Sequence, residues 1–294
     1  MNKTAIALGF FDGVHLGHRA ILRAAVEAAE RDGLEPVALT FDTQPRAYFS
    51  GLPGEYLTTR DEKIAAMKDL GIRRVEVLSF ARWCACPAED FVRDYLVKEL
   101  GAAQLICGDD YRFGARAAGN PTLLRQRGSE LGFGVTVCAP VEQDGRRISS
   151  SRLREALQCG RMEEVTACLG RDYTITGPVR HGKGLGRQLG FATLNVERDP
   201  GLIRPRLGVY AALALVDGRL WPAAVNIGIR PTFDDGDGLT VEAHLTGFSG
   251  DVYGRTVTIY LKRFIRDERK FDTAEALQAQ VEQDLREVEQ ACRI

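Results

Sequence analysis

A glycine-rich turn at residues 9–18 (GFFDGVHLGH) constrains the fold of this chain more than any other stretch. Residues 4–8 before it form a short apolar run, as in a buried strand, and apolar residues recur at helical spacing over residues 19–30. Glycines at a strand-to-helix turn let the backbone approach a ligand closely, and the free N–H groups at the helix start attract a phosphate. The stretch therefore predicts a β–α unit with an anion site at its mouth.

Two histidines, His15 and His18, are three residues apart in this turn, so they can lie on one face of the first helical turn. Such a pair could also be ordinary surface residues or half of a metal site. The flanking glycines (Gly9, Gly13, Gly17) and the place at the carboxyl end of the first strand favour a phosphate site, because open α/β sheets bind ligands there. A phosphate held between a helix terminus and two imidazoles indicates nucleotidyl transfer.

The first half of the chain alternates strand-like and helix-like segments. Strands are expected at residues 36–41, 75–80, 104–107 and 135–139, and helices at residues 59–70, 88–100 and 121–131. This alternation predicts a parallel sheet with helices on both faces. The loops after the strands collect Gly, His, Asp and Arg residues, and we expect the ligand there.

A serine run closes this half at residues 148–154 (ISSSRLR), just before a short helix at residues 155–158. Serine is a favoured helix cap, but one serine suffices for that role. The three hydroxyls of residues 149–151, together with Arg154 in the first helical turn, could instead bind a pyrophosphate and neutralise its charge as it leaves.

From residue 174 onward the chain is β-rich. Strands are expected at residues 174–179, 208–216, 220–227, 239–248 and 255–264, with a hairpin turn at Asp217 and Gly218. An amphipathic helix at residues 273–292 ends the chain. This order predicts a small closed barrel with one helix packed on it. We place the boundary at residues 170–173, which gives a first domain of residues 1–170 and a second of residues 171–294.

Three stretches of the second half carry residues suited to phosphate chemistry. Residues 182–187 (GKGLGR) could be a phosphate-covering loop or a solvated turn. Thr193 and Asn195 are two residues apart, so in an extended segment their oxygen atoms face the same side and suit Mg²⁺. Glu242 alternates with apolar neighbours and shares a face with Thr240 and His244. It is either a surface residue or, if it faces a ligand, a general base toward an alcohol.

Composition bounds the partners and the compartment. The 294 residues suffice for about two domains, and 39 Lys and Arg against 40 Asp and Glu leave a net charge of -1, which gives no electrostatic reason to expect nucleic acid. Too few apolar residues follow Met1 for a signal peptide or membrane span, so we expect a cytoplasmic protein that does not enter a membrane. Seven cysteines at scattered spacings argue against a disulfide framework.

Taken together, the motifs resemble those of the bacterial bifunctional riboflavin kinase/FAD synthetase family over essentially the whole chain. The matching stretches are residues 9–18, 108–114 (GDDYRFG), 148–154, 169–173 (LGRDY), 186–191 (GRQLGF), 226–233 (NIGIRPTF), 241–242 (VE) and 253–254 (YG). The resemblance implies a Rossmann-like nucleotidyltransferase domain followed by a β-barrel kinase domain.

For the first half, the resemblance implies transfer of AMP from ATP to FMN, which gives FAD and pyrophosphate. His15 and His18 would contact the ATP phosphates, with Arg154 as a further catalytic residue. The other nucleotide contacts implied are Gly9, Phe10, Asp12, Gly17, Asp110, Arg112, Ser149, Ser150 and Ser151.

For the second half, the resemblance implies phosphorylation of riboflavin to FMN by ATP, with Glu242 as base and with Thr193 and Asn195 holding Mg²⁺ and nucleotide. The remaining residues implied are Gly182, Lys183, Gly186 and Arg187 for the nucleotide, and Asn226, Arg230 and Thr232 for the flavin. The expected partners are riboflavin, FMN, FAD and ATP, and we expect a monomer or a weak homo-oligomer.

Two departures from the family pattern stand out. The kinase motif usually reads Pro-Thr-Ala-Asn, and here Ala192 and Leu194 replace its proline and alanine. Loss of the proline frees a backbone dihedral, so the alternative is an FMN adenylyltransferase with a weakened or non-catalytic flavin-binding kinase-like module. Ser151 in place of a threonine keeps the hydroxyl.

Overall fold

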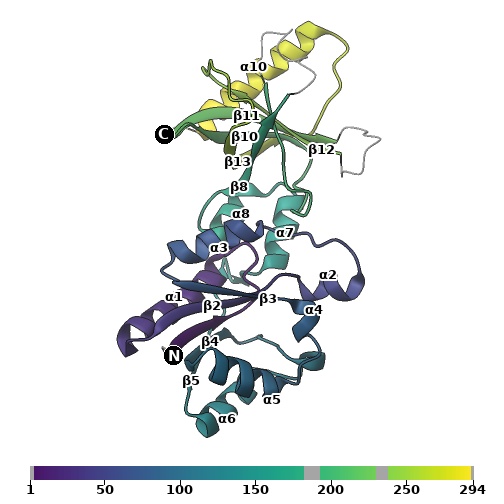
Figure 1. The fold of residues 1–294 in the computed structure, drawn as a ribbon. Helices are drawn as coiled ribbons and strands as arrows, with labels where there is room; N and C mark the ends of the chain where they lie inside the picture. The colour runs from purple at the N-terminus through teal and green to yellow at the C-terminus, as the bar shows by residue number, and fades with distance from the viewer. Residues whose placement is uncertain (1–2, 182–192, 230–237, 293–294) are drawn as a thin grey trace. The chain divides into compact units, whose positions relative to one another are not determined.

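The computed structural model describes residues 3–181, 193–229 and 238–292 (Figure 1). These residues divide into two compact units, Met1–Ser150 and Ser151–Ile294. None of the described helices is both long and apolar enough to cross a membrane.

The first unit is built on a parallel sheet with strand order β3-β2-β1-β4-β5. Its strands are β1 (Thr4–Leu8), β2 (Glu35–Phe41), β3 (Arg74–Leu78), β4 (Ala102–Gly108) and β5 (Gly134–Cys138). Its helices are α1 (Leu16–Asp32), α2 (Pro45–Ser50), α3 (Arg60–Asp69), α4 (Phe80–Trp83), α5 (Ala88–Asp90), η1 (Phe91–Glu99), η2 (Ala115–Ala117) and α6 (Pro121–Leu131). A short hairpin, β6 (Glu142–Gln143) and β7 (Arg146–Arg147), follows β5.

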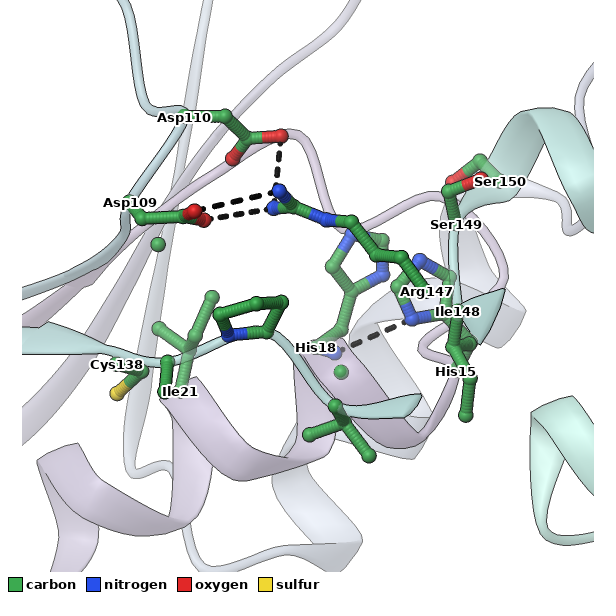
Figure 2. Close-up of a pocket in the computed structure, with 15 residues that line it drawn as sticks. His15, His18, Ile21, Asp109, Asp110, Cys138, Arg147, Ile148, Ser149 and Ser150 are labelled. Carbon is green, nitrogen blue, oxygen red and sulfur yellow. Dashed lines mark hydrogen bonds and ion pairs between the residues drawn. The ribbon is translucent and has the colours of Figure 1, made fainter. Parts of the chain in front are cut away.

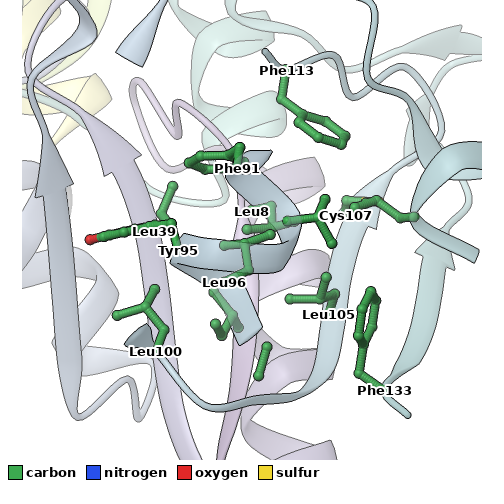
Figure 3. Packing of buried hydrophobic residues seen from close by; sticks show 14 of the residues in the cluster. Leu8, Leu39, Phe91, Tyr95, Leu96, Leu100, Leu105, Cys107, Phe113 and Phe133 are labelled. Carbon is green, nitrogen blue, oxygen red and sulfur yellow. The ribbon is translucent and has the colours of Figure 1, made fainter. Parts of the chain in front are cut away.

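Helices cover both faces of this sheet because successive residues of a strand point to opposite faces. On β1, Ala5 and Ala7 pack in the cluster that holds α1, and the small side chains let this helix approach closely. Ile6 and Leu8 pack on the other face, in a cluster with residues of η1 and α6. Figure 3 shows part of this cluster, with Leu8 near Leu96 of η1 and Leu105 of β4. The predicted Rossmann-like class is therefore confirmed.

Some elements differ from the sequence prediction at their ends or in their winding. Helix α1 begins at Leu16, three residues before the predicted start, because His15 caps it. The expected helix at residues 88–100 is a short α-helix, α5, that continues as the π-helix η1. Helix α2 lies in a segment for which the sequence predicted no helix, and α4 begins at Phe80, the last residue of the strand expected at residues 75–80.

The second unit contains two helices, a closed barrel and a last helix. Helices α7 (Ser150–Gln158) and α8 (Met162–Leu169) come first, and α7 begins inside the serine run. The barrel follows the order β10-β11-β12-β9-β8-β13. Its strands are β8 (Tyr173–Arg180), β9 (Thr193–Val196), β10 (Gly208–Val216), β11 (Arg219–Ile229), β12 (Leu239–Leu245) and β13 (Thr256–Arg266), and α10 (Ala274–Ala291) ends the unit.

The predicted barrel and its hairpin are confirmed. Asp217 and Gly218 both have positive φ angles, 49° and 78°, and the antiparallel register closes directly around them at Val216 and Arg219. Helix α10 packs on the outside of the barrel, where Val288 and Cys292 join a cluster with Ala211 and Leu213 of β10. The barrel with its packed helix therefore forms as the sequence predicted.

Candidate functional site

The turn after β1 holds its backbone in a conformation that few residues adopt. The φ angles of Phe11, Gly13 and Val14 are 57°, 81° and 42°. A positive φ is unusual for a bulky residue and most unusual for a β-branched one such as Val14, and it costs on the order of 1–3 kcal/mol. Strain of this kind persists only where the surroundings fix it, and it concentrates at functional sites.

The two histidines of the turn stack on each other. Their ring centroids are 3.6 Å apart with an interplanar angle of 16°. His15 caps α1, since its Nδ1 accepts a hydrogen bond from the backbone N–H of His18 at 3.3 Å. A Cβ at Gly17 would lie 3.2 Å from the His15 ring, so glycine is what allows this close packing. The predicted pairing of the histidines at the helix start is thus what the chain forms.

A polar cavity of about 200 Å³ opens in front of the histidines (Figure 2). Besides His15 and His18, its lining includes Gly17, Asp110, Ser149 and Ser150. Across the cavity, the Arg147 guanidinium pairs with Asp109 at 2.8 Å and with Asp110 at 2.9 Å. Helix-start N–H groups, imidazoles and hydroxyls around one small cavity make an environment suited to phosphate groups, whereas the charge of Arg147 is offset by the two aspartates.

An apolar cavity of about 470 Å³ adjoins the polar one. Its walls include the aromatic side chains of Phe10, Phe41, Phe49, Phe80, Trp83 and Tyr111. Both cavities are lined by His18, Ile21, Gly108 and Asp110. A ligand with a flat ring system on one side and phosphate on the other fits this pair of cavities.

The predicted nucleotide residues of the first half fall into four groups. Those that line the polar cavity are His15, Gly17, His18, Asp110, Ser149 and Ser150. Gly9, Phe10 and Arg112 line the apolar cavity. Asp12 is 2 % exposed, and its Oδ1 accepts hydrogen bonds from the backbone N–H groups of Leu57 and Thr58. Its side chain is therefore bonded to the backbone and lines neither cavity. Ser151 and Arg154 belong to the second unit, and their roles stay predictions.

A groove of about 370 Å³ lies on the barrel, between the outer face of its strands and α10. Val241, Ala243 and Leu245 of β12 are buried, and the alternate residues Glu242 and His244 line the groove. Thr193 and Asn226 also line it, together with Glu268, Arg266 and Asp284. The predicted residues Thr193, Asn226 and Glu242 are therefore brought together.

The pairing of β9 with β12 places oxygen-bearing side chains opposite one another. Asn195 is the register partner of Glu242, and Thr193 is that of His244. A hydroxyl, an amide oxygen and a carboxylate on adjacent strands are a donor set that fits Mg²⁺. The other predicted residues of this half, Gly182, Lys183, Gly186, Arg187, Arg230 and Thr232, lie outside the described residues, as does Ala192.

Sequence reasoning missed three parts of these sites. The aromatic wall comes from segments far apart in the chain, although several of its rings directly follow strands. Arg147 precedes the serine run and contacts Asp109, which is 38 residues away, and the adjacent Asp110. Glu268 follows β13 and accepts a hydrogen bond from Nδ2 of Asn226 at 3.2 Å. Of the three, Glu268 could have been found from the sequence, since a carboxylate just after a barrel strand can reach the end of the neighbouring strand.

Two family models match the chain, one in each half. The model described as FAD synthetase matches residues 1–152, and the model described as riboflavin kinase matches residues 169–292. The first match contains both cavities of the first unit, and the second contains the groove on the barrel.

Curated relatives match along nearly the whole chain. Bifunctional riboflavin kinase/FMN adenylyltransferases from Pseudomonas fluorescens, Escherichia coli strain K12 and Bacillus subtilis strain 168 are 37%, 36% and 33% identical. The alignments cover 95%, 95% and 97% of this chain and 89%, 90% and 91% of the relatives. A crystal structure from Streptococcus pneumoniae, described as a macrolide-efflux protein, has a TM-score of 0.88 and 29% identity, covering 97% of this chain and 94% of that one.

Proposed function

The chain belongs to the bifunctional riboflavin kinase/FMN adenylyltransferase family, and on this premise we propose that it makes FAD from riboflavin in two ATP-dependent steps. In the first step, riboflavin is phosphorylated to FMN. In the second, the AMP group of ATP is transferred to FMN, and pyrophosphate leaves. We assign the first step to the barrel and the second to the unit with the parallel sheet.

One observation carries the adenylyl-transfer assignment: a polar and an aromatic cavity adjoin and share His18 and Asp110. The aromatic cavity suits the flavin ring, and the polar cavity suits the triphosphate of ATP. At their junction an FMN phosphate oxygen attacks the α-phosphorus, and the bond to the bridging oxygen of the β-phosphate breaks. We propose that His15, His18 and the N-terminus of α1 stabilise the negative charge that develops there, with Ser149, Ser150, Ser151 and Arg154 acting on the departing pyrophosphate.

For the kinase step, the groove on the barrel supports the assignment of Glu242 as the base. Its carboxylate would accept the proton of the ribityl 5′-hydroxyl while that oxygen attacks the γ-phosphorus of ATP and ADP leaves. Thr193 and Asn195 would hold Mg²⁺, which when bound would neutralise phosphate charge. We also propose Asn226, Arg230 and Thr232 as flavin contacts, and Gly182, Lys183, Gly186 and Arg187 as nucleotide contacts.

We propose a cytoplasmic enzyme that is a monomer or a weak homo-oligomer, with the two activities divided at residues 170 and 171. The alternative of a non-catalytic kinase-like barrel is supported by no comparison, and Thr193 and Glu242 both line the groove.

Flavin chromatography tests the proposal directly. The purified chain is incubated with riboflavin, ATP and Mg²⁺, and in parallel with FMN, ATP and Mg²⁺. FAD in both reactions is the expected result. FAD from FMN alone would establish the alternative with an inactive kinase, and FAD from neither would overturn the proposed function. Omitting Mg²⁺ from both reactions tests the metal requirement.

A further inference from the structure

Lys63 lies beneath the strained turn, on α3, and is buried with 6 % of its surface exposed. A buried lysine is rare unless its charge is paired and its donors are satisfied. Sequence reasoning left this residue unused, and it lines none of the three cavities. Its contacts therefore need another explanation.

The ammonium group of Lys63 bonds to the ends of two neighbouring strands. Its Nζ donates to the carbonyl oxygen of Phe10 at 3.2 Å, to Oγ1 of Thr40 at 3.1 Å and to the carbonyl oxygen of Phe41 at 3.3 Å. It also lies 4.4 Å from the centroid of the Phe10 ring. Phe10 and Phe41 are walls of the apolar cavity, so one cation holds the backbone of both.

Asp12 makes the reciprocal connection from the turn to the segment before α3. Its Oδ1 accepts the backbone N–H of Leu57 at 2.9 Å, and the N–H of Gly13 donates to Oγ1 of Thr58 at 3.3 Å. Asp12 and Lys63 attract each other electrostatically. The strained turn is thus held at two points, at Phe10 by Lys63 of α3 and at Asp12 and Gly13 by the segment that precedes α3.

Resting on the proposed function, we infer that Lys63 is a positioning residue for adenylyl transfer. By fixing the carbonyl groups of Phe10 and Phe41, it holds the aromatic wall of the apolar cavity at a fixed position relative to His15 and His18. A shift of about 1 Å at a reacting centre can cost 10²-fold in rate, so loss of this brace affects chemistry at a site that Lys63 never touches.

This role depends on whether the amino group of Lys63 carries its third proton. The hydroxyl hydrogen of Thr40 is already donated to the carbonyl oxygen of Phe10 at 2.8 Å, so all three bonds of Lys63 need hydrogens of its own. A neutral amine has two. Burial lowers the pKa of Lys63 to about 8, against the charges of Asp12 and Asp42, which raise it, while Arg60 lowers it further. Above this pH one of the three acceptors loses its donor.

The test compares Lys63→Met with Lys68→Met, an exposed lysine on the same helix. On each purified chain, kcat and KM are measured for FMN adenylylation and for riboflavin phosphorylation. We expect Lys63→Met to lower the kcat of adenylylation about 10-fold or more, with phosphorylation within two-fold of the parent. Thr40→Val, which removes one acceptor, should lower adenylylation in the same direction, and Lys68→Met should change neither activity.

The parent chain supplies a second measurement that needs no variant. Its adenylylation kcat should fall as pH rises through 8, and its phosphorylation kcat should not. Parental adenylylation in Lys63→Met, an equal fall of both activities, or a flat adenylylation profile above pH 8 would each overturn the positioning role. A parent chain with phosphorylation but no adenylylation at any pH would instead overturn the proposed function of the first unit.

Discussion

At the scale of single residues, the proposed role of His18 can be tested most directly, because this residue lines both cavities of the first unit. His18→Ala removes one imidazole from the stacked pair and leaves the cap of α1, which His15 provides. We expect FMN adenylylation to fall by about 10² or more, since charge stabilisation at the reacting phosphorus is lost. Riboflavin phosphorylation by the same chain is the control, and a variant that makes FAD from FMN at the parental rate would remove His18 from the reaction.

For Glu242 we expect the opposite pattern, with loss of the kinase activity and not of the adenylyltransferase activity. Glu242→Gln keeps the size of the side chain and removes the base, so riboflavin phosphorylation should fall by a factor on the order of 10² or more while FMN adenylylation persists. Both rates are measured by chromatography of the flavins. Equal loss of the two activities would show that Glu242 supports the fold and does not accept the proton of the ribityl hydroxyl.

Lys63 predicts an opposite pH dependence of stability and activity. Its pKa is about 8 in the folded chain and has the ordinary value of 10.5 when unfolded. Between these values the unfolded chain holds a proton that the folded chain has released, so this residue's contribution to the free energy of unfolding rises with pH, by at most about 1.4 kcal/mol per unit. The free energy of unfolding is measured with urea for the parent and for Lys63→Met at pH 7.5 and 9.5. Relative to Lys63→Met, the parent should be more stable at pH 9.5 than it is at pH 7.5. A difference that is independent of pH would contradict the buried, titrating state.

Residue-level prediction succeeded where the signal was local. The spacing of His15 and His18 within one helical turn was sufficient to bring their rings together, and period-two alternation along β12 placed Glu242 and His244 on one face, where both line the groove. Asp12 and Lys63 show the limit, because a carboxylate in a glycine-rich turn and a lysine on a polar helix are usually exposed to ligand or water. Their burial depends on which helix packs under the turn, which is a tertiary property.

At the scale of elements, the contact between β8 and β9 controls where Thr193 and Asn195 lie. Arg180 of β8 is the register partner of Asn195, and a Cβ at Gly177 would collide with the backbone oxygen of Glu197. Because that oxygen belongs to the backbone, it cannot move aside cheaply. Gly177 therefore permits the close approach that holds β9 in the barrel.

Gly177→Ala should displace β9 and with it the oxygen donors proposed for Mg²⁺. We expect riboflavin phosphorylation to fall about 10-fold or more, with FMN adenylylation retained, and barrel stability to fall by about 1–3 kcal/mol. Thr174→Ala on the same strand is the matched control. Parental phosphorylation in Gly177→Ala would show that β9 tolerates the shift and that its position does not limit the reaction.

The elements that sequence patterns recovered are those with a strong period. Strand β10 and helix α6 begin and end as predicted, because a continuous apolar run and a proline-to-glycine helical segment each carry their own limits. The π-winding of η1 has no such signal, since the spacing of its buried residues (91, 92, 95 and 96) also fits an α-helix. Helix α2 is too short and too exposed for a periodic pattern to develop.

At the scale of the whole molecule, the helices α7 and α8 belong to the same unit as the barrel. Arg206 donates its backbone N–H to Leu157 at 2.9 Å and Nη1 to Cys159 at 3.3 Å, and its guanidinium lies 4.4 Å from the Phe264 ring centroid. Met162 of α8 is fully buried, and α8 packs against β13. The barrel thus carries an attached helical pair that the predicted boundary at residue 170 would remove.

Two fragments test this connection. Residues 151–294 should fold and retain riboflavin phosphorylation, whereas residues 171–294 should be less stable by several kcal/mol, on the order of 2–5 for each large buried side chain whose contacts are lost. Trp221 is the single tryptophan of both fragments, so its fluorescence during urea unfolding reports the barrel. Equal midpoints for the two fragments would show that the helical pair contributes nothing to the barrel.

The adjoining cavities of the first unit also bear on feedback. FAD joins an adenylate to a flavin, so a bound product would occupy the polar and the aromatic cavity together and cover His18 and Asp110. Either substrate must then wait for the product to leave. On the proposed assignment of the two cavities, FAD would therefore compete with both ATP and FMN, and FMN adenylylation would slow as FAD accumulates.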